Sequence, residues 1–228
     1  MPMQKVVLVT GASSGFGLAI ARTLAARGHH VYGTSRAPAG DDGAVRMLAL
    51  DVASDDSVRR CIESLLATEG RIDVLVNNAG VGLCGSVEDT VLDEVRWQME
   101  TNFFGAVRMI RAVLPQMRAQ RAGRLITIGS LGGLVGMPYQ PFYSASKFAL
   151  EGLNEALRLE LAGSGIDATS ITPGDFKTGF TAARVFARAS RSPVPCGGPA
   201  RRYRRRRRGP ERTGGASRRA RGFSACAG

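Results

Sequence analysis

Short apolar runs alternate with helical patterns along residues 5–171, and this alternation is the strongest constraint on the fold. The runs expected to form strands are Val6–Thr10, Val31–Thr34, Val45–Leu50, Ile72–Val76, Leu125–Ile128 and Ile166–Ile171. Strands that alternate with helices are typical of a parallel sheet with helices on both faces. Because crossovers between parallel strands are right-handed, we predict an α/β fold of one Rossmann-type, doubly wound sheet.

The helical segments carry their own start and stop signals. Apolar residues recur at helical spacing before Gly28, and Ser54 is a candidate cap for the next helix. A long helical stretch runs to about Arg118 with an interruption near Thr101–Asn102, and we expect Pro115 to kink it or end its regular part. A further helix is predicted over Tyr143–Leu161.

Polar and glycine-rich segments follow the predicted strands. In a doubly wound sheet the ligand lies beyond the carboxyl ends of the strands. That rule places on one rim Gly11–Gly17, Arg36, Asp51, Asn77–Gly80, Ser130 and Pro173–Gly174.

The net charge of +12 is confined to one end of the chain. Residues 1–180 hold 17 Lys and Arg against 18 Asp and Glu, whereas residues 181–228 hold 14 Arg against one Glu. We therefore divide the chain into a folded domain over 1–180 and an Arg-rich tail over 181–228, which we expect to be disordered. The tail's composition is that of a GC-rich gene translated in a shifted frame, and the alternative is a genuine basic tail that binds nucleic acid.

Several other classes of protein are disfavoured. No run of 18 uncharged apolar residues is present, and the first strand-like run begins too early for a signal peptide. The four cysteines lack metal-ligand spacing, so we expect no metal site and a cytoplasmic protein with reduced thiols.

The glycine-rich turn Thr10–Gly17 lies between a predicted strand and a predicted helix. Glycines let the backbone approach a pyrophosphate, and a helix N-terminus favours its negative charge. A tight turn without a ligand is the alternative interpretation. The spacing G-x-x-x-G-x-G departs from the usual dinucleotide fingerprint.

With that spacing, the chain resembles the short-chain dehydrogenase/reductase family over about 180 residues. The resemblance rests on the ordered matches Thr10–Gly17, Asp51, Asn77–Gly80, Asn102, Ser130, Tyr143-x-x-x-Lys147 and Pro173–Gly174. Two local stretches, Gly129–Pro138 and Ser144–Leu153, look like 17β-hydroxysteroid and retinol dehydrogenases. The family pattern disappears after about residue 180, so the resemblance implies an incomplete C-terminal part with an unpaired sixth strand.

The catalytic residues follow from the chemistry and the resemblance together. Tyr143 and Lys147 share a helix face, and an ammonium beside a phenol lowers the phenol pKa, which makes Tyr143 the candidate general acid and base. Ser130 would stabilise charge on the substrate oxygen. The resemblance implies that Lys147 also holds the nicotinamide ribose and that Asn102 supports a water-linked proton path. The alternatives are two surface neighbours and a solvent-facing amide.

The cofactor residues are taken from the resemblance and from the end of the second strand. No acidic residue follows that strand, and Arg36 can pair with a 2′-phosphate, so NADP(H) is expected rather than NAD(H). Asn77–Gly80 could equally be only a turn, and Asp51 only a strand end. The expected cofactor-binding set, besides Arg36, Tyr143 and Lys147, is Gly11, Ser13, Ser14, Gly15, Phe16, Gly17, Asp51, Val52, Asn78, Ala79, Gly80, Pro173 and Gly174.

The resulting hypothesis is an NADP-dependent oxidoreductase acting on a carbonyl or secondary alcohol of an apolar small molecule. The alternatives are a dinucleotide-binding protein whose catalysis is impaired by its altered C-terminus, and nucleic-acid binding through the tail. We expect no membrane partner. The resemblance implies a homodimer through the helices near Met99–Arg118 and Tyr143–Leu161.

Overall fold

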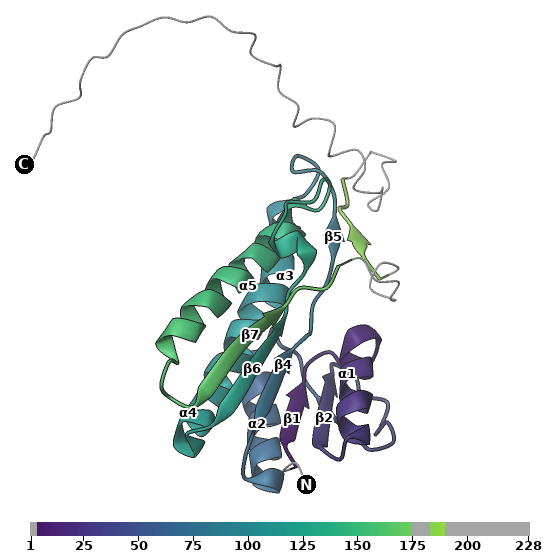
Figure 1. The fold of residues 1–228 in the computed structure, drawn as a ribbon. Helices are drawn as coiled ribbons and strands as arrows, with labels where there is room; N and C mark the ends of the chain where they lie inside the picture. The colour runs from purple at the N-terminus through teal and green to yellow at the C-terminus, as the bar shows by residue number, and fades with distance from the viewer. Residues whose placement is uncertain (1–3, 175–182, 190–228) are drawn as a thin grey trace, which may run out of the picture. The chain divides into compact units, whose positions relative to one another are not determined.

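The computed structural model describes residues 4–174 and 183–189, and its main feature is a six-stranded parallel sheet (Figure 1). The strand order is β3-β2-β1-β4-β6-β7. The strands are β1 (Val6–Val9), β2 (His30–Ser35), β3 (Val45–Ala49), β4 (Val74–Asn77), β6 (Gly123–Ile128) and β7 (Ile166–Ile171). The predicted doubly wound α/β fold is confirmed, since the order reverses between β1 and β4.

Helices cover both faces of this sheet. Alternate residues of β1 point to opposite faces, with Val7 and Val9 on the side of α1 and Leu8 in the core on the other side. The helices are α1 (Gly15–Ala26), α2 (Asp55–Glu69), α3 (Leu92–Met99), α4 (Gly105–Gln120) and α5 (Pro141–Glu160). Ser54 caps α2 as predicted, because its hydroxyl accepts a hydrogen bond from the backbone N–H of Ser57.

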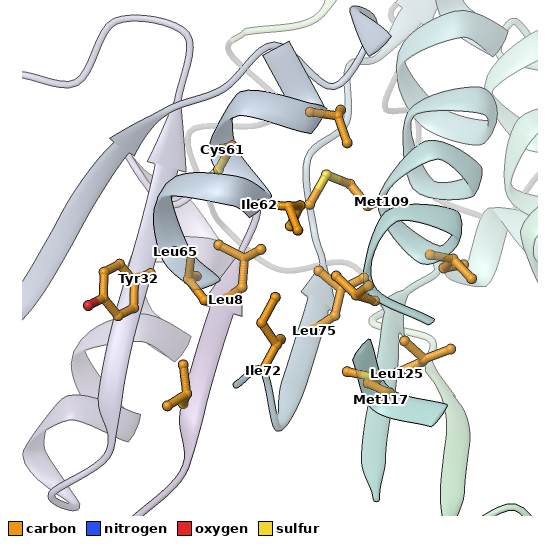
Figure 2. Packing of buried hydrophobic residues seen from close by; sticks show 14 of the residues in the cluster. Leu8, Tyr32, Cys61, Ile62, Leu65, Ile72, Leu75, Met109, Met117 and Leu125 are labelled. Atoms are coloured by element: carbon orange, nitrogen blue, oxygen red, sulfur yellow. The ribbon is translucent and has the colours of Figure 1, made fainter. Parts of the chain in front are cut away.

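The larger core lies between the sheet and helices α2 and α4 (Figure 2). Leu65 from α2 and Met109 from α4 approach Leu8 and Leu75 of the central strands, and all four side chains are fully buried. A smaller cluster on the opposite face joins α1 to β1, β2, β3 and β4. The two clusters thus bury both faces of the middle of the sheet, from which its carboxyl ends project.

The long helical stretch is interrupted where expected, and of the two effects expected of Pro115 an end of the helix is not seen. The interruption near Thr101–Asn102 is a π-helical segment, η1 (Glu100–Phe104), but α4 then runs through Pro115 to Gln120 without ending. Pro115 cannot donate a hydrogen bond to the carbonyl of Arg111. Both residues are exposed, so water can satisfy that carbonyl and the helix continues.

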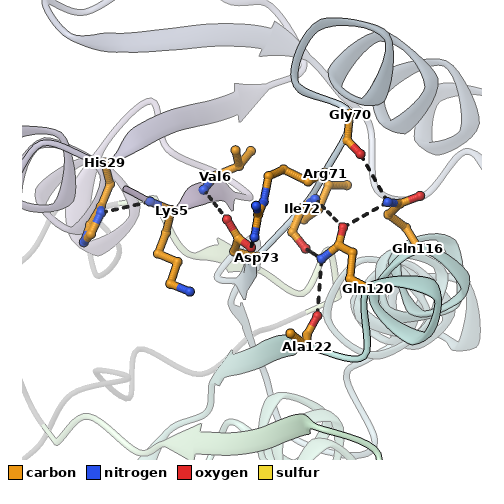
Figure 3. A network of polar contacts seen from close by, with 10 residues as sticks. All are labelled: Lys5, Val6, His29, Gly70, Arg71, Ile72, Asp73, Gln116, Gln120 and Ala122. Carbon is orange, nitrogen blue, oxygen red and sulfur yellow. Dashed lines mark hydrogen bonds and ion pairs between the residues drawn. The ribbon is translucent and has the colours of Figure 1, made fainter. Parts of the chain in front are cut away.

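A polar network joins the segments at the amino ends of the strands (Figure 3). Asp73 accepts a hydrogen bond from the backbone N–H of Val6 at 2.8 Å and pairs with Arg71. The amide of Gln120 accepts from the backbone N–H of Ile72 and donates to its carbonyl. These bonds tie β1, β4 and the end of α4 together at the rim opposite the carboxyl ends of the strands.

The edge of the sheet at β7 carries no further described strand. Among the described residues, no helix covers β6 and β7 on the α1 side, where Asp167, Thr169 and Ile171 are exposed. The start of the predicted tail differs from expectation, because β8 (Val185–Phe186) pairs in parallel with β5 (Leu83–Cys84). Ala187 is buried there, while residues 190–228 of the expected tail lie outside the described part.

The depth of the core leads to a stability prediction. Leu125→Ala removes a fully buried side chain and should lower the free energy of unfolding by about 2–5 kcal/mol, measured by urea denaturation. Leu159→Ala, at a side chain that is 77% exposed, should change that free energy by less than about 0.5 kcal/mol. Equal effects of the two substitutions would contradict the described packing.

Candidate functional site

The turn between β1 and α1 is built from glycines that other backbone segments approach closely. Gly11 has φ +65°, and a Cβ there would lie 2.9 Å from the Cα of Ala79. A Cβ on Gly17 would collide with the carbonyl oxygen of Gly11 and the side-chain nitrogen of Asn78. The turn therefore needs glycine at both positions.

The amino end of α1 faces the rim without a side-chain cap. Ser14 occupies the cap position in an extended conformation, and its side chain makes no capping hydrogen bond. Ser13, Ser14 and Gly15 are exposed, and Phe16 is half-buried. Uncapped backbone N–H groups at a helix start can bind a phosphate, which suits the chemistry expected of this turn.

The segment after β4 is bonded to the same turn. The side chain of Asn78 donates to the carbonyls of Thr10 and Gly11 at 2.8 and 3.0 Å. The Thr10 hydroxyl accepts from the backbone N–H groups of Asn78 and Ala79. Asn78 thus braces the glycine turn. A Cβ added to Gly80 would lie 3.4 Å from the side-chain oxygen of Asn102.

The end of β2 lies beside the turn, because the backbone N–H of Ala12 donates to the carbonyl of Thr34 at 2.8 Å. Arg36 follows two residues later and is exposed. After β3, the Asp51 carboxylate accepts from the backbone N–H of Ala53, and Val52 is buried. Asp51 therefore stabilises its own turn in addition to standing at the rim.

Tyr143 lies in the first turns of α5 and is only 7% exposed. Its phenol is hydrogen-bonded by the side chain of Ser130, which follows β6. Two glycines after Ser130 make this approach feasible. A Cβ on Gly132 would lie 3.2 Å from the Tyr143 ring, and one on Gly133 would lie 2.9 Å from the carbonyl oxygen of Lys147.

Lys147 lies one helical turn after Tyr143, and its side chain is almost fully enclosed. Its Nζ donates to the carbonyl of Ile128 at 2.8 Å and lies 5.9 Å from the centroid of the Tyr143 ring. Burial lowers the pKa of Lys147 to about 8, and the nearby charge of Glu151 opposes that fall. A buried ammonium in this position can change protonation close to neutral pH.

The pKa of Tyr143 does not follow the sequence-based expectation. Burial raises it above the usual range, and the hydrogen bond from Ser130 and the positive charge of Arg184 oppose that rise only in part. The groups that lower the pKa of Tyr143 are therefore Ser130 and Arg184, and the lowering expected from the Lys147 ammonium is not among them.

Asn102 is buried in the π-helical segment, with 1% of its surface exposed. Its amide oxygen accepts from the backbone N–H of Val81, and its nitrogen donates to the Val81 carbonyl and the Ser146 hydroxyl. A cavity of about 10 Å³ separates Asn102 from Lys147, and it is large enough for one water molecule.

The structure brings most of the predicted residues to one rim. The carbonyl of Pro173 accepts from the backbone N–H of Leu131, so the end of β7 adjoins the Ser130 turn, and Gly174 follows directly. Sequence reasoning missed three buried or half-buried residues near the site, namely Gln98, Glu151 and Arg184. The Gln98 side chain accepts from the backbone N–H of Leu83 and donates to the carbonyl of Val81. Only Glu151 carried a signal, namely its spacing four residues after Lys147.

The described residues contain no group of three or more His, Cys, Asp or Glu side chains arranged to hold a metal ion. Within the same residues, no helix combines the length and apolarity that a membrane span requires.

Comparison with known proteins gives a match to the family model of the short chain dehydrogenases over residues 5–188. The chain is 54% identical over 177 residues to a 3-ketodihydrosphingosine reductase of Bacteroides thetaiotaomicron, covering 78% of this chain and 66% of that protein. It is 42% identical over 191 residues to human 17-beta-hydroxysteroid dehydrogenase type 1, covering 77% and 58% respectively. The chain thus spans about two thirds or less of the length of these relatives.

Solved structures agree with these matches. A short-chain dehydrogenase from Streptomyces avermitilis superposes with a TM-score of 0.75 at 39% identity, covering 81% of this chain and 72% of that one. Two further structures with TM-scores of 0.73 are ElxO with NADP bound, at 31% identity, and a short chain dehydrogenase/reductase from Burkholderia phymatum in complex with NAD, at 29%. They cover 77% and 79% of this chain, and 75% and 69% of their own chains.

The close approach at Gly17 leads to a prediction about the turn. Gly17→Ala should lower the free energy of unfolding by about 1–3 kcal/mol, because its methyl group collides with the Gly11 carbonyl and the Asn78 amide. Gly152→Ala is the matched control, since a Cβ there meets open space on α5. Thermal unfolding measures both, and a Gly17→Ala protein as stable as the control would contradict the geometry.

Proposed function

Because this chain belongs to the short-chain dehydrogenase family, we propose that it transfers a hydride between NADP(H) and a carbonyl or secondary alcohol of an apolar small molecule. Membership makes it an oxidoreductase by family. The choice of cofactor, the substrate and the roles of individual residues are the proposal.

One observation carries this proposal: the Tyr143 phenol is hydrogen-bonded by Ser130, and the buried Lys147 ammonium lies 5.9 Å from the centroid of the Tyr143 ring. The Ser130 turn follows β6, and the glycine turn follows β1, so both lie where strands end on one rim. A proton donor beside a dinucleotide-binding turn is the arrangement that carbonyl reduction needs.

The residues of the rim fit a dinucleotide. Gly11 and Gly17 let the turn pack closely against Ala79 and Asn78, the space around Gly15 is open, and the uncapped start of α1 offers N–H groups to a pyrophosphate. We assign cofactor binding to this turn together with Asp51, Val52 and Asn78–Gly80, with Pro173 and Gly174 on the nicotinamide side. When bound, NADPH would supply the hydride, and the protein would supply the proton and the groups that stabilise charge on the substrate oxygen.

Tyr143 then donates its proton to the substrate oxygen, and Ser130 stabilises the charge that develops there. The Lys147 ammonium favours the phenolate that remains on Tyr143. We propose that a water molecule in the cavity between Asn102 and Lys147 returns the proton from solvent. Asn102 holds that part of the site in place through its bonds to Val81 and Ser146.

The preference for NADP(H) rests on Arg36. It is exposed beyond the end of β2, next to the glycine turn, and residues 36–40 directly after that strand include no acidic side chain to bond a ribose hydroxyl. A guanidinium can bind the 2′-phosphate with two parallel hydrogen bonds. One of the similar solved structures holds NADP and another holds NAD. The proposed preference for NADP(H) therefore rests on Arg36 and not on these structures.

Exposed apolar side chains near the site support an apolar substrate. Leu131, Leu134 and Val135 follow Ser130, and Val185 and Phe186 lie on β8. The relative from Bacteroides thetaiotaomicron is named a reductase of 3-ketodihydrosphingosine, which makes this long-chain ketone the first substrate to test. We also propose a homodimer through α4 and α5, where Phe104 and Phe148 are exposed at or near these helices.

Substitution of the phenol tests the catalytic assignment. Tyr143→Phe removes the proton donor and should lower turnover of 3-ketodihydrosphingosine by about 10²–10⁴-fold, measured by NADPH oxidation. Binding of NADPH, followed by fluorescence, should be retained. Wild-type turnover in the variant would show that Tyr143 is not the acid.

Substitution at the end of β2 tests the cofactor assignment. Arg36→Ala should reduce the ratio of kcat/KM for NADPH over NADH, because the 2′-phosphate loses its charged partner. Arg111→Ala, at an exposed position on α4, should leave the ratio unchanged. A wild-type protein that uses both cofactors equally well would rule out the proposed preference.

A further inference from the structure

Glu151 continues the line of functional side chains on α5. It lies four residues after Lys147, which itself lies four residues after Tyr143, so the three side chains share one helix face. Glu151 is half-buried against the sheet, whereas Glu155, one turn further, is exposed. The proton-transfer steps proposed above do not use Glu151.

The carboxylate of Glu151 has a fixed position between β6 and β7. Its Oε1 accepts a hydrogen bond from the hydroxyl of Ser170 on β7 at 2.7 Å. The same oxygen occupies the space where a Cβ on Gly129 would stand, so any larger residue there would displace it. Gly129 is itself held by a bond from its backbone N–H to the carbonyl of Ile171 at 2.8 Å.

The neighbouring residue holds the ammonium. The carbonyl of Ile128 accepts from Nζ of Lys147 at 2.8 Å, and Gly129 follows directly. Two consecutive residues at the end of β6 therefore contact the cation and the anion. Both charged side chains are thereby positioned at the end of β6.

The surroundings of Lys147 contain few other charges. On α5 the titratable neighbours are Tyr143 and Glu151, and Arg184 acts on Tyr143 from the segment before β8. The polar side chains that line the adjoining cavity from the turn after β1, from β4 and from η1 are uncharged: Thr10, Asn77, Thr101 and Asn102. Glu151 is thus the anion placed to offset the burial of Lys147.

We propose that Glu151 is a positioning residue that keeps the Lys147 ammonium charged, through a carboxylate locked to Ser170 in the space left by Gly129. This role rests on the proposed function, because a charged Lys147 matters only if the ammonium assists Tyr143. Burial alone favours the neutral amine, which cannot stabilise a phenolate. The direction agrees with the electrostatics, since Glu151 raises the pKa of Lys147 against the lowering by burial.

The test uses the full chain and does not need turnover. The sequence has only three lysines, Lys5, Lys147 and Lys177, so NMR of protein labelled at the lysine side chains can follow each ammonium separately. Lys147→Arg identifies the signal of Lys147. In the wild type this signal should titrate near pH 8.

Glu151→Gln should move the titration of Lys147 to lower pH, because the offsetting charge is lost while the hydrogen-bonding shape is kept. Glu155→Gln, on the same helix but exposed, should leave it unchanged. Glu151→Asp, which keeps the charge but withdraws it from Ser170, should give a smaller fall than Gln. An unchanged titration in a folded Glu151→Gln protein overturns the proposal.

If Glu151→Gln does not fold, Glu151→Asp decides the question alone: a fall in the pKa of Lys147 supports the proposal, and no change overturns it. The titration of Lys147 is read separately from turnover, so failure of this proposal and failure of the proposed function are distinguishable. A chain that reduces no carbonyl could still show the shift, and an active enzyme could lack it.

Discussion

Lys147 carries its charge where only 6% of its surface reaches solvent, and the arrangement of the whole rim depends on how that burial is tolerated. An isolated buried ammonium is strongly unfavourable and would lose its proton. The structure supplies a carbonyl acceptor from Ile128 and a carboxylate on the next helical turn. These contacts fix α5 against the end of β6, and with it the distance between Tyr143 and Ser130.

The neighbouring elements are shaped by the same requirement. Gly132 and Gly133 allow the turn after Ser130 to lie against α5, and a side chain at either would press on Tyr143 or Lys147. On the opposite side, the π-helical segment places Asn102 against Val81 and Ser146, where it lines the small cavity beside Lys147. The glycine turn after Ser130 and the π-helical segment thus both lie beside the buried Lys147 ammonium.

Much of this could be predicted from the sequence, for identifiable reasons. The six strands were placed within one or two residues because their apolar runs are short and bounded by turn residues. The spacing of Tyr143 and Lys147 placed both on one helix face, whereas their proposed roles needed the family resemblance as well. The continuation of α4 through Pro115 could not be predicted, because it depends on whether the freed carbonyl of Arg111 is exposed. The raised pKa of Tyr143 and the contribution of Arg184 could not be predicted, since both depend on burial and on a contact between distant segments. The pairing of β8 with β5 was missed because two residues carry no recognisable strand pattern.

The central claim of the proposed function is that NADPH bound at this rim transfers hydride to a carbonyl carbon. The most direct measurement uses NADPH deuterated at the reactive carbon of its nicotinamide ring, with 3-ketodihydrosphingosine as the acceptor and mass spectrometry of the product. The account predicts an alcohol that carries one deuterium on the former carbonyl carbon. Tight binding of NADPH with no deuterated alcohol formed from this ketone or from a panel of apolar ketones and aldehydes would contradict it.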